Sequence, residues 1–399
     1  MVRRFRVGAA LTAGLLAAAV GGGQAVIAAP AKAPHRVATA WLNGVSATSA
    51  HDVWAVGAFG HADGSAPLIE HWNGSKWQAT KPFLNQEENE DFFTGVSATS
   101  GTSAVAAGSV LDQYGLLLGE HWNGHKWTED FMPIVGPDDG TAVISGTAAV
   151  QGGSSWAVGN FYGGPKGTAQ AQLTMTLRWN AAKNTWVRVK SPSPAGNGSG
   201  AASVLNAVAS DSPTDAWAVG RTSSGPSSQV NTLIEHWDGS SWTVVSSPDP
   251  AQPKCGDDEL LGVTASPAGT WAVGDACGAP IVLQLKDGQW QAKSTPSGPA
   301  GVPEQLSSVA VASASNAWAV GNVGLRPLIL HWNGTRWGKP RIAFPAGAAS
   351  ATFTGVTAVS PTAAWAVGKA NFPHKVTKLL IEHWNGKKWT LISAPNPTP

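Results

Sequence analysis

Charged residues are scarce in this sequence. Aspartate, glutamate, lysine and arginine together make up 13% of the 399 residues, about half of the usual share. The formal net charge is +1, and lysine and arginine form no cluster beyond Arg3, Arg4 and Arg6. Proteins that bind nucleic acid carry a basic patch, so we expect no nucleic-acid partner. A low charge content instead suits a chain whose sheets are mostly buried on both faces.

The sequence also lacks an apolar run long enough to cross a membrane. The run from Val7 to Val20 is shorter than the roughly 20 residues that a helical span needs. Three arginines precede it and small residues follow it around 28–33, which is the layout of a secretory signal peptide. We therefore expect residues 1–33 to be a signal peptide, the protein to be secreted, and no stable membrane span.

Short catalytic and metal-binding motifs are missing as well. The chain has no G-x-S-x-G nucleophile elbow, no H-E-x-x-H zinc motif, no P-loop and no EF-hand loop. We accordingly expect no cofactor and no metal ion. A glycosidase is not excluded, because its two carboxylates can come from distant parts of a chain.

What the sequence does contain is a signature that returns seven times. Its first copy reads Asp-Val-Trp-Ala-Val-Gly over 52–57 and Leu-Ile-Glu-His-Trp-Asn-Gly over 68–74, followed by Trp77. The first tryptophan slot holds Trp54, Val105, Trp156, Trp217, Trp271, Trp318 and Trp365. The second holds Trp72, Trp122, Trp179, Trp237, Leu285, Trp332 and Trp384, and the third holds Trp77, Trp127, Trp186, Trp242, Trp290, Trp337 and Trp389. These slots contain every one of the 20 tryptophans except Trp41, so the repeated indoles are predicted to be core residues.

The repeat predicts an all-β fold, a seven-bladed β-propeller of four-stranded antiparallel blades. The first unit offers strand candidates at 42–48, 53–58, 67–72 and 76–80, here named strands A to D. Trp72 and Trp77 flank an Asn-Gly turn and are expected to face each other across the C–D hairpin. The predicted propeller covers 34–399, with blades at about 41–80, 92–130, 141–190, 203–247, 259–294, 305–342 and 351–393.

The only two cysteines fall within the fifth unit. Cys255 lies just before its strand A, and Cys277 lies just after its strand B. In an antiparallel pair these two points are adjacent, so we predict a disulfide between them.

Comparison of the repeats separates structural residues from candidate site residues. Histidine recurs in strand C as His71, His121, His236, His331 and His383. Residues at equivalent positions around a ring cannot converge on one ion, so we expect these histidines to make buried hydrogen bonds to backbone or indole groups.

The A–B and C–D connections are short and alike, whereas the D–A and B–C loops vary, and binding residues usually lie on such variable loops. Acidic candidates precede strand A and are expected to ring the mouth of the central channel: Glu90, Asp91, Asp139 and Asp258. Aromatic candidates lie in the B–C loops: Tyr114, Tyr162, Phe161 and Phe372. His61 and His374 complete the set, because they lie on loops of the first and last blades, which adjoin when the ring closes. Solvated loop ends and local packing are the alternative interpretations.

The paired motifs Asp-x-Trp-Ala-Val-Gly and Glu-His-Trp-Asn-Gly-x-x-Trp resemble the repeats of secreted bacterial propeller proteins common in actinobacteria, and more loosely kelch-like and galactose-oxidase-like propellers. The resemblance covers the chain from Trp41 to its C-terminus. It lacks the Gly-Gly doublet of kelch repeats and the Gly-His and Trp-Asp pairs of WD repeats. The resemblance implies a fold and an extracellular location, but no catalytic residues.

Exposed aromatic rings beside carboxylates and amides suit sugar rings, which stack through their C–H faces. The sequence therefore favours a secreted, monomeric, non-catalytic module that binds an extracellular glycan or protein through the D–A and B–C face. The alternative is a polysaccharide-acting glycosidase or lyase that uses carboxylates such as Asp139, Asp258 or Glu90 at the channel mouth.

Overall fold

The structure is a computed structural model that divides into two units, Met1–Arg36 and Val37–Pro399. It describes residues 39–61, 64–83, 90–110, 116–136, 141–150, 154–163, 170–225, 228–249 and 256–394. The predicted signal peptide lies outside these residues and stays a prediction. No helix in the described part is long and apolar enough to cross a membrane.

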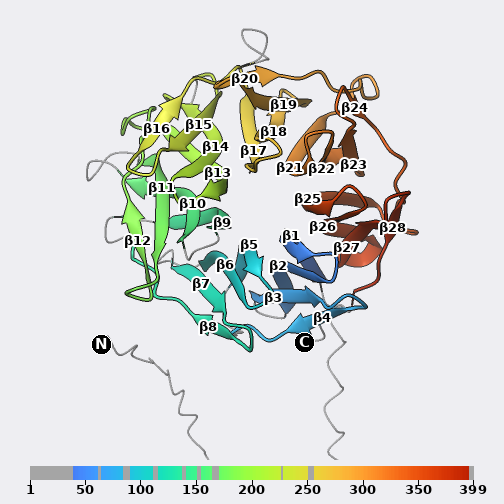
Figure 1. Ribbon diagram of the computed structural model, residues 1–399. Helices are drawn as coiled ribbons and strands as arrows, with labels where there is room; N and C mark the ends of the chain where they lie inside the picture. The colour runs from blue at the N-terminus through green and yellow to red at the C-terminus, as the bar shows by residue number, and fades with distance from the viewer. Residues whose placement is uncertain are drawn as a thin grey trace, which may run out of the picture. The chain divides into compact units, whose positions relative to one another are not determined.

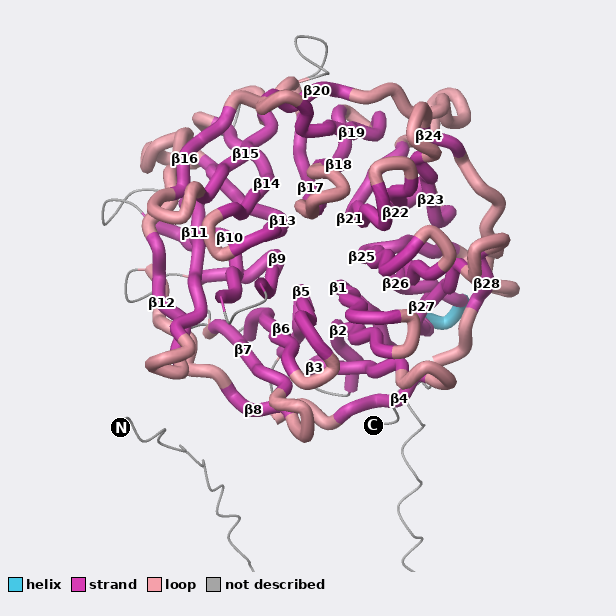
Figure 2. The backbone as a smooth tube through the Cα atoms, in the orientation of Figure 1, coloured by secondary structure: helices cyan, strands magenta, loops and turns pink. Residues whose placement is uncertain are grey.

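The second unit consists of strands and one short helical turn (Figure 2). Its strands are β1 (Thr39–Ser49), β2 (Asp52–His61), β3 (Gly64–Trp72), β4 (Trp77–Thr80), β5 (Asp91–Ser100), β6 (Ser103–Val110), β7 (Leu117–Trp122), β8 (Trp127–Glu129), β9 (Ala142–Val150), β10 (Ser154–Gly163), β11 (Ala171–Asn180), β12 (Thr185–Val189), β13 (Ala202–Ser212), β14 (Asp215–Ser223), β15 (Asn231–Trp237), β16 (Trp242–Val245), β17 (Asp258–Thr264), β18 (Trp271–Ala276), β19 (Ala279–Lys286), β20 (Gln289–Ala292), β21 (Glu304–Ser313), β22 (Asn316–Val323), β23 (Arg326–Trp332), β24 (Trp337–Gly338), β25 (Ser350–Ser360), β26 (Ala363–Phe372), β27 (Val376–Trp384) and β28 (Trp389–Leu391). The helical turn η1 is Pro373–Lys375.

These strands form antiparallel sheets of sequential neighbours. Five sheets have four strands each, β1–β4, β5–β8, β17–β20, β21–β24 and β25–β28, and one sheet has eight. The eight-stranded sheet joins β9–β12 to β13–β16 through a single parallel pair, Gln172 with Ala202. The all-β class and the four-stranded antiparallel unit are thus confirmed. The predicted number of seven blades requires the eight-stranded sheet to be divided at this pair.

The sheets stand side by side around a ring with their first strands innermost (Figure 1). Each innermost strand contacts the next one along the chain, from β1 to β5 and onward to β25, and β25 contacts β1. The Thr354 hydroxyl on β25 donates to the Leu42 carbonyl on β1 at 2.7 Å. The Asn43 amide donates to the Phe93 carbonyl on β5 at 2.8 Å. The junction of β25 with β1, which closes the ring, therefore has a side-chain-to-backbone hydrogen bond like that between β1 and β5. A ring of four-stranded sheets is the β-propeller architecture.

Tryptophan packing holds neighbouring sheets together. Trp72 and Trp77 pair across the β3–β4 hairpin with ring centroids 6.0 Å apart, which confirms the predicted cross-strand pair. Trp54 on β2 reaches the next sheet, where its ring meets Trp127 edge-on at 5.1 Å. Such aromatic contacts contribute about 0.5–1.5 kcal/mol each beyond the area they bury.

The glycine that ends each Trp-Ala-Val-Gly motif allows strands A and B to approach closely. A Cβ atom on Gly57 would lie 2.0 Å from the Trp41 carbonyl oxygen, and the equivalent distance at Gly108 to the Phe92 carbonyl is also 2.0 Å. A β-bulge follows on β1 between Leu42 and Gly44. The repeated glycine therefore positions the start of each innermost strand, and with it the residues that border the channel.

Candidate functional site

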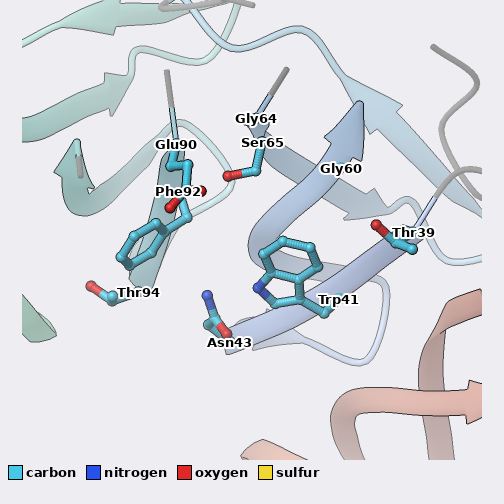
Figure 3. A pocket seen from close by; sticks show the side chains of 9 residues that line it. All are labelled: Thr39, Trp41, Asn43, Gly60, Gly64, Ser65, Glu90, Phe92 and Thr94. Atoms are coloured by element: carbon cyan, nitrogen blue, oxygen red, sulfur yellow. The ribbon is translucent and has the colours of Figure 1, made fainter. Parts of the chain in front are cut away.

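A cavity of about 520 Å³ opens between the first two sheets. Its lining residues come from the starts of β1, β3 and β5 and from the end of β2 (Figure 3). They are Thr39, Trp41, Asn43, Gly60, Gly64, Ser65, Glu90, Phe92 and Thr94. A parallel bridge between Ser65 and Glu90 brings the start of β3 against the start of β5. The cavity thus forms where two sheets meet, and no single repeat contains it.

Two aromatic rings border this cavity at equivalent positions of adjacent strands. Trp41 directly precedes the buried Leu42 on β1, and Phe92 directly precedes the buried Phe93 on β5. Both side chains are half-buried, and Asn43 stands between them (Figure 3). The same position in the other innermost strands holds Val143, Val204, Glu259, Gln305 and Thr352. An aromatic pair at this level therefore occurs at one junction of the ring.

The polar lining is a set of hydroxyl, amide and carboxylate groups. Asn43 and Thr94 occupy the bulges of β1 and β5. The Thr94 hydroxyl donates to the Ala107 carbonyl at 3.1 Å, and the Ser65 hydroxyl donates to the Asp91 carbonyl at 3.3 Å. Glu90 is exposed and is the one charged residue among the described residues that line the cavity. The cavity therefore combines apolar faces with hydrogen-bonding groups, as ligand sites do.

The acidic residues predicted at the channel mouth divide into two groups. Glu90 is exposed as expected, but Asp91 and Asp258 are buried, so the expectation is wrong for both. They lie at equivalent positions, each two residues before a core residue of its strand, where alternation turns the side chain into the sheet interface. Glu304 occupies the same position on β21 and pairs with the Lys339 ammonium at 2.7 Å.

These placements bear on the enzymatic alternative. Asp139 lies outside the described residues, and Asp258 is buried. A glycosidase needs two carboxylates that face its substrate. Within the described residues, Glu90 is the only one of the three proposed acids that faces open space.

The predicted aromatic candidates do not gather in one place. Tyr114 lies outside the described residues. Tyr162, on β10, is 36% exposed, and its hydroxyl accepts a hydrogen bond from the Gln172 amide at 3.1 Å. Phe161 is a core residue with the Arg188 guanidinium 4.1 Å from its ring centre, so its prediction as a ligand contact is wrong. Phe372 is half-buried against the core of the last sheet.

The remaining candidates are placed as follows. The side chain of His61 lies outside the described part of the structure, and His374 is exposed on η1 with a φ of 62°. No group of three metal-ligating side chains occurs among the described residues. Cys255 also lies outside them, so the disulfide stays a prediction; the Cys277 amide donates to the Asp257 carbonyl at 3.0 Å.

The repeated histidines are structural, with partners that differ from the expected ones. His71 stacks on Trp54 of its own sheet at 4.0 Å, and its Nε2 lies 2.6 Å from the Asp52 carboxylate. His236 stacks on Trp217 at 4.2 Å and pairs with Asp215 at 2.7 Å. The aspartate of the Asp-x-Trp motif is therefore the partner of His71 and His236, whereas His121 pairs with Asp130 and His331 with Asn316, in place of the expected backbone or indole groups.

A glutamate precedes four of the five repeated histidines, and the sequence did not indicate its burial. Glu70, Glu120, Glu235 and Glu382 are all completely buried in the third strands of their sheets. Burial raises the pKa of Glu70 and Glu235 to about 8 and that of Glu382 to about 7. Desolvation is the largest cause, because a charged carboxylate loses its hydration there.

Comparisons with known proteins find similarity in the fold. No family model matches the sequence, and no curated protein matches it. A puromycin-hydrolyzing peptidase of Mycobacterium tuberculosis is similar in structure, with a TM-score of 0.54 and 10% identity over 89% of this chain and 54% of the peptidase. A Dyadobacter fermentans protein of unknown function has a TM-score of 0.50 and 12% identity over 75% of this chain and 93% of its own. A lectin of Aleuria aurantia in complex with Fucα1-6GlcNAc has a TM-score of 0.49 and 13% identity over 89% of this chain and 96% of the lectin.

At such identities, likeness to the peptidase and to the Dyadobacter protein shows a shared fold alone. The site must therefore be argued from this chain's own residues. Trp41 had one signal in the sequence, because it is the single tryptophan outside the repeated slots. Asn43, Ser65 and Thr94 had none, since only the packing of two sheets places them around one cavity.

Proposed function

We propose that this protein is a secreted, non-catalytic binding module that holds a glycan in the cavity between Trp41 and Phe92. The observation that carries the proposal is this aromatic pair, which faces open space while the repeated tryptophans are used for packing. Sugar rings stack their C–H faces on aromatic rings, and their hydroxyls need hydrogen-bond partners around the edge.

The polar lining supplies such partners. Asn43, Thr94 and Ser65 offer oxygen lone pairs, and Glu90 offers a carboxylate that water can also reach. A cavity of about 520 Å³ falls within the range of roughly 300–1,000 Å³ typical of small-ligand sites. It accommodates one or two sugar rings, and its open side lets a longer chain continue into solvent.

The proposal includes the location of the binding face. The lining residues stand at the starts of β1, β3 and β5 and at the end of β2, next to the D–A and B–C loops of the predicted blades, which supports this location. It also includes a closed ring of seven blades, with β9–β12 and β13–β16 counted as two, and export directed by residues 1–33.

A glycan and cell-wall array tests the proposal. Residues 34–399, which contain the whole Val37–Pro399 unit, are applied as the wild type and as Trp41→Ala. Val143→Ala is the matched control, because Val143 has the equivalent position on β9 and does not line the cavity. We expect retention of at least one glycan by the wild type and by the control, and loss of retention with Trp41→Ala.

Two outcomes would contradict the proposal. One is an array on which no glycan is retained by the wild type. The other is retention that Trp41→Ala leaves unchanged while Tyr162→Ala removes it, which would move the site to the β10 region.

A further inference from the structure

The charge of the cavity limits which sugars suit it. Among the described residues of the lining, Glu90 is the one charged side chain, and none of them is a lysine or an arginine. Acidic residues one or two positions further along other innermost strands have cationic partners. Glu259 lies 3.1 Å from the Arg221 guanidinium, and Glu304 lies 2.7 Å from the Lys339 ammonium. Within the described residues Glu90 has no such partner, so its negative charge is available to a ligand.

Three hydrogen-bond donors of the lining are used within the protein. The hydroxyls of Thr94 and Ser65 both donate to backbone carbonyls, and Asn43 uses one of its two amide hydrogens on the Phe93 carbonyl. What these side chains still offer is mainly oxygen lone pairs, and a carboxylate is only an acceptor. A ligand rich in donors therefore fits better than one rich in acceptors.

The two aromatic rings also favour a positively charged ligand. The faces of Trp41 and Phe92 carry negative electrostatic potential, which attracts a cation placed within about 6 Å of the ring centre. An ammonium group has three donors and a full positive charge, so it matches the rings, the lone pairs and the carboxylate at once.

We propose that the Trp41–Phe92 cavity selects sugars that carry a free, protonated amino group, with the ammonium directed to Glu90. This inference rests on the proposed glycan-binding function and names its ligand class. Hexosamine residues without an N-acetyl group have this chemistry. Sugars with a carboxylate, such as uronic acids, are disfavoured because their charge would oppose that of Glu90.

Titration calorimetry with three soluble oligosaccharides of equal length tests the inference. They are a glucosamine oligomer, its fully N-acetylated counterpart and a galacturonic acid oligomer, each titrated into the wild type, Glu90→Gln and Asp211→Asn. Asp211 is a matched control because it is an exposed acid at the opposite end of its innermost strand and does not line the cavity.

We expect the glucosamine oligomer to bind the wild type about tenfold more tightly than its N-acetylated counterpart, as one charged hydrogen bond provides. Glu90→Gln should reduce this preference to within about twofold, while Asp211→Asn should keep it. Added salt should weaken binding of the glucosamine oligomer more than binding of the neutral one, because salt screens exposed charges.

The possible outcomes distinguish a failure of the amino-sugar preference from a failure of glycan binding itself. Equal affinity for the charged and neutral oligomers, unchanged by Glu90→Gln, overturns the inference and leaves glycan binding intact. Tighter binding of the galacturonic acid oligomer does the same. Failure of every glycan to bind overturns both. Binding of a lysine oligopeptide as tightly as the glucosamine oligomer shows recognition of a cation without a sugar and overturns the stated ligand class.

Discussion

The junction between the first two sheets and the junctions near β17 and β21 use the same backbone position differently. Trp41 and Phe92 occupy it at the first junction and border an open cavity. Glu259 and Gln305 occupy it on β17 and β21. There the protein satisfies its own polar groups: the Asn206 amide donates to Glu259 at 2.8 Å, and the Gln305 amide donates to Asp275 at 3.1 Å. The equivalent backbone position thus borders a cavity at one junction and carries a self-contained polar network at the other.

This contrast shows where a repeat protein can acquire a site. The tryptophans of the repeated slots pack between sheets, whereas Trp41, outside the slots, lines the cavity. The two kinds of indole are distinguished by their neighbours, and exchanging or removing side chains at matched positions tests the distinction.

The largest expected effect comes from a tryptophan in a repeated slot. Trp217 is buried, stacks on His236 at 4.2 Å and meets Trp290 of the next sheet edge-on at 5.3 Å. Trp217→Ala should lower the free energy of unfolding by about 3–5 kcal/mol, because it leaves a large cavity. Trp41→Ala should cost clearly less, since Trp41 is half-buried. Urea unfolding of the two variants measures the difference, and equal losses would remove the distinction between the two kinds of tryptophan.

The second prediction concerns Glu70, whose carboxyl has no hydrogen-bond partner among the described residues. Its pKa is about 8 in the folded protein against an ordinary value of 4.5, so the folded state retains a proton that the unfolded chain releases. The resulting stability is complete below the unfolded pKa and is lost as the pH rises toward about 8. The contribution of Glu235 has the same sign.

Glu70→Leu is the test, because Leu283 and Leu330 occupy the equivalent position in two other sheets. We expect the variant to be more stable than the wild type by about 1–3 kcal/mol at alkaline pH, since burial of an unpaired polar group costs that much. Thermal unfolding between about pH 5 and pH 9 measures it, and the gain should shrink on acidification. A gain that does not change with pH would show that Glu70 does not titrate in this range.

The third prediction converts one junction into the other. Phe92→Gln places on β5 the residue that β21 has at this position. Loss of one stacking face should weaken glycan affinity by about tenfold, an effect near 1.4 kcal/mol, which is within the range of an aromatic contact. Titration calorimetry with the retained glycan measures it, and Val143→Ala again serves as the control. An unchanged affinity would show that Trp41 alone forms the binding surface.

The smallest effect is expected in the polar network. Arg221 and Glu259 are each about 30% exposed in their side chains, and pairs of this kind contribute roughly 0.2–1 kcal/mol. Arg221→Gln should therefore lower the free energy of unfolding by less than about 1 kcal/mol and leave glycan affinity unchanged. Urea unfolding and calorimetry check both parts. A clear loss of affinity would mean that the ligand extends across the channel.

Much of the fold could be read from residue spacing. The tryptophan slots, the cross-strand pair of Trp72 and Trp77 and the close-packed glycines such as Gly57 depend on local strand geometry, which repeats with the sequence. The strands are longer than predicted, as with β1, which extends over Thr39–Ser49. The extra residues lack the motif, and some of them, such as Thr39 and Trp41, line the cavity.

The sequence did not show which of the acidic candidates faces the solvent, because this depends on how side chains alternate between the two faces of a strand. Glu90 and Asp91 are neighbours of the same chemical type, yet one is exposed and the other is buried. Their sequence context fixes only that they precede a strand. Which of the two faces the solvent depends on the register between β5 and β6, where Asp91 pairs with Val110.

The spacing of tryptophan, glycine and the Asn-Gly turns specified four-stranded sheets and their tryptophan packing, because those contacts form within one repeat or between equivalent positions of neighbours. The cavity also depends on packing between distant segments of the chain. Trp41 and Phe92 are far apart in sequence and meet only when the first two sheets pack side by side, with Ser65 brought in from a third segment. Non-local packing of this kind leaves no periodic trace in the chain, so the position and charge of the proposed binding site became visible only once the sheets were assembled.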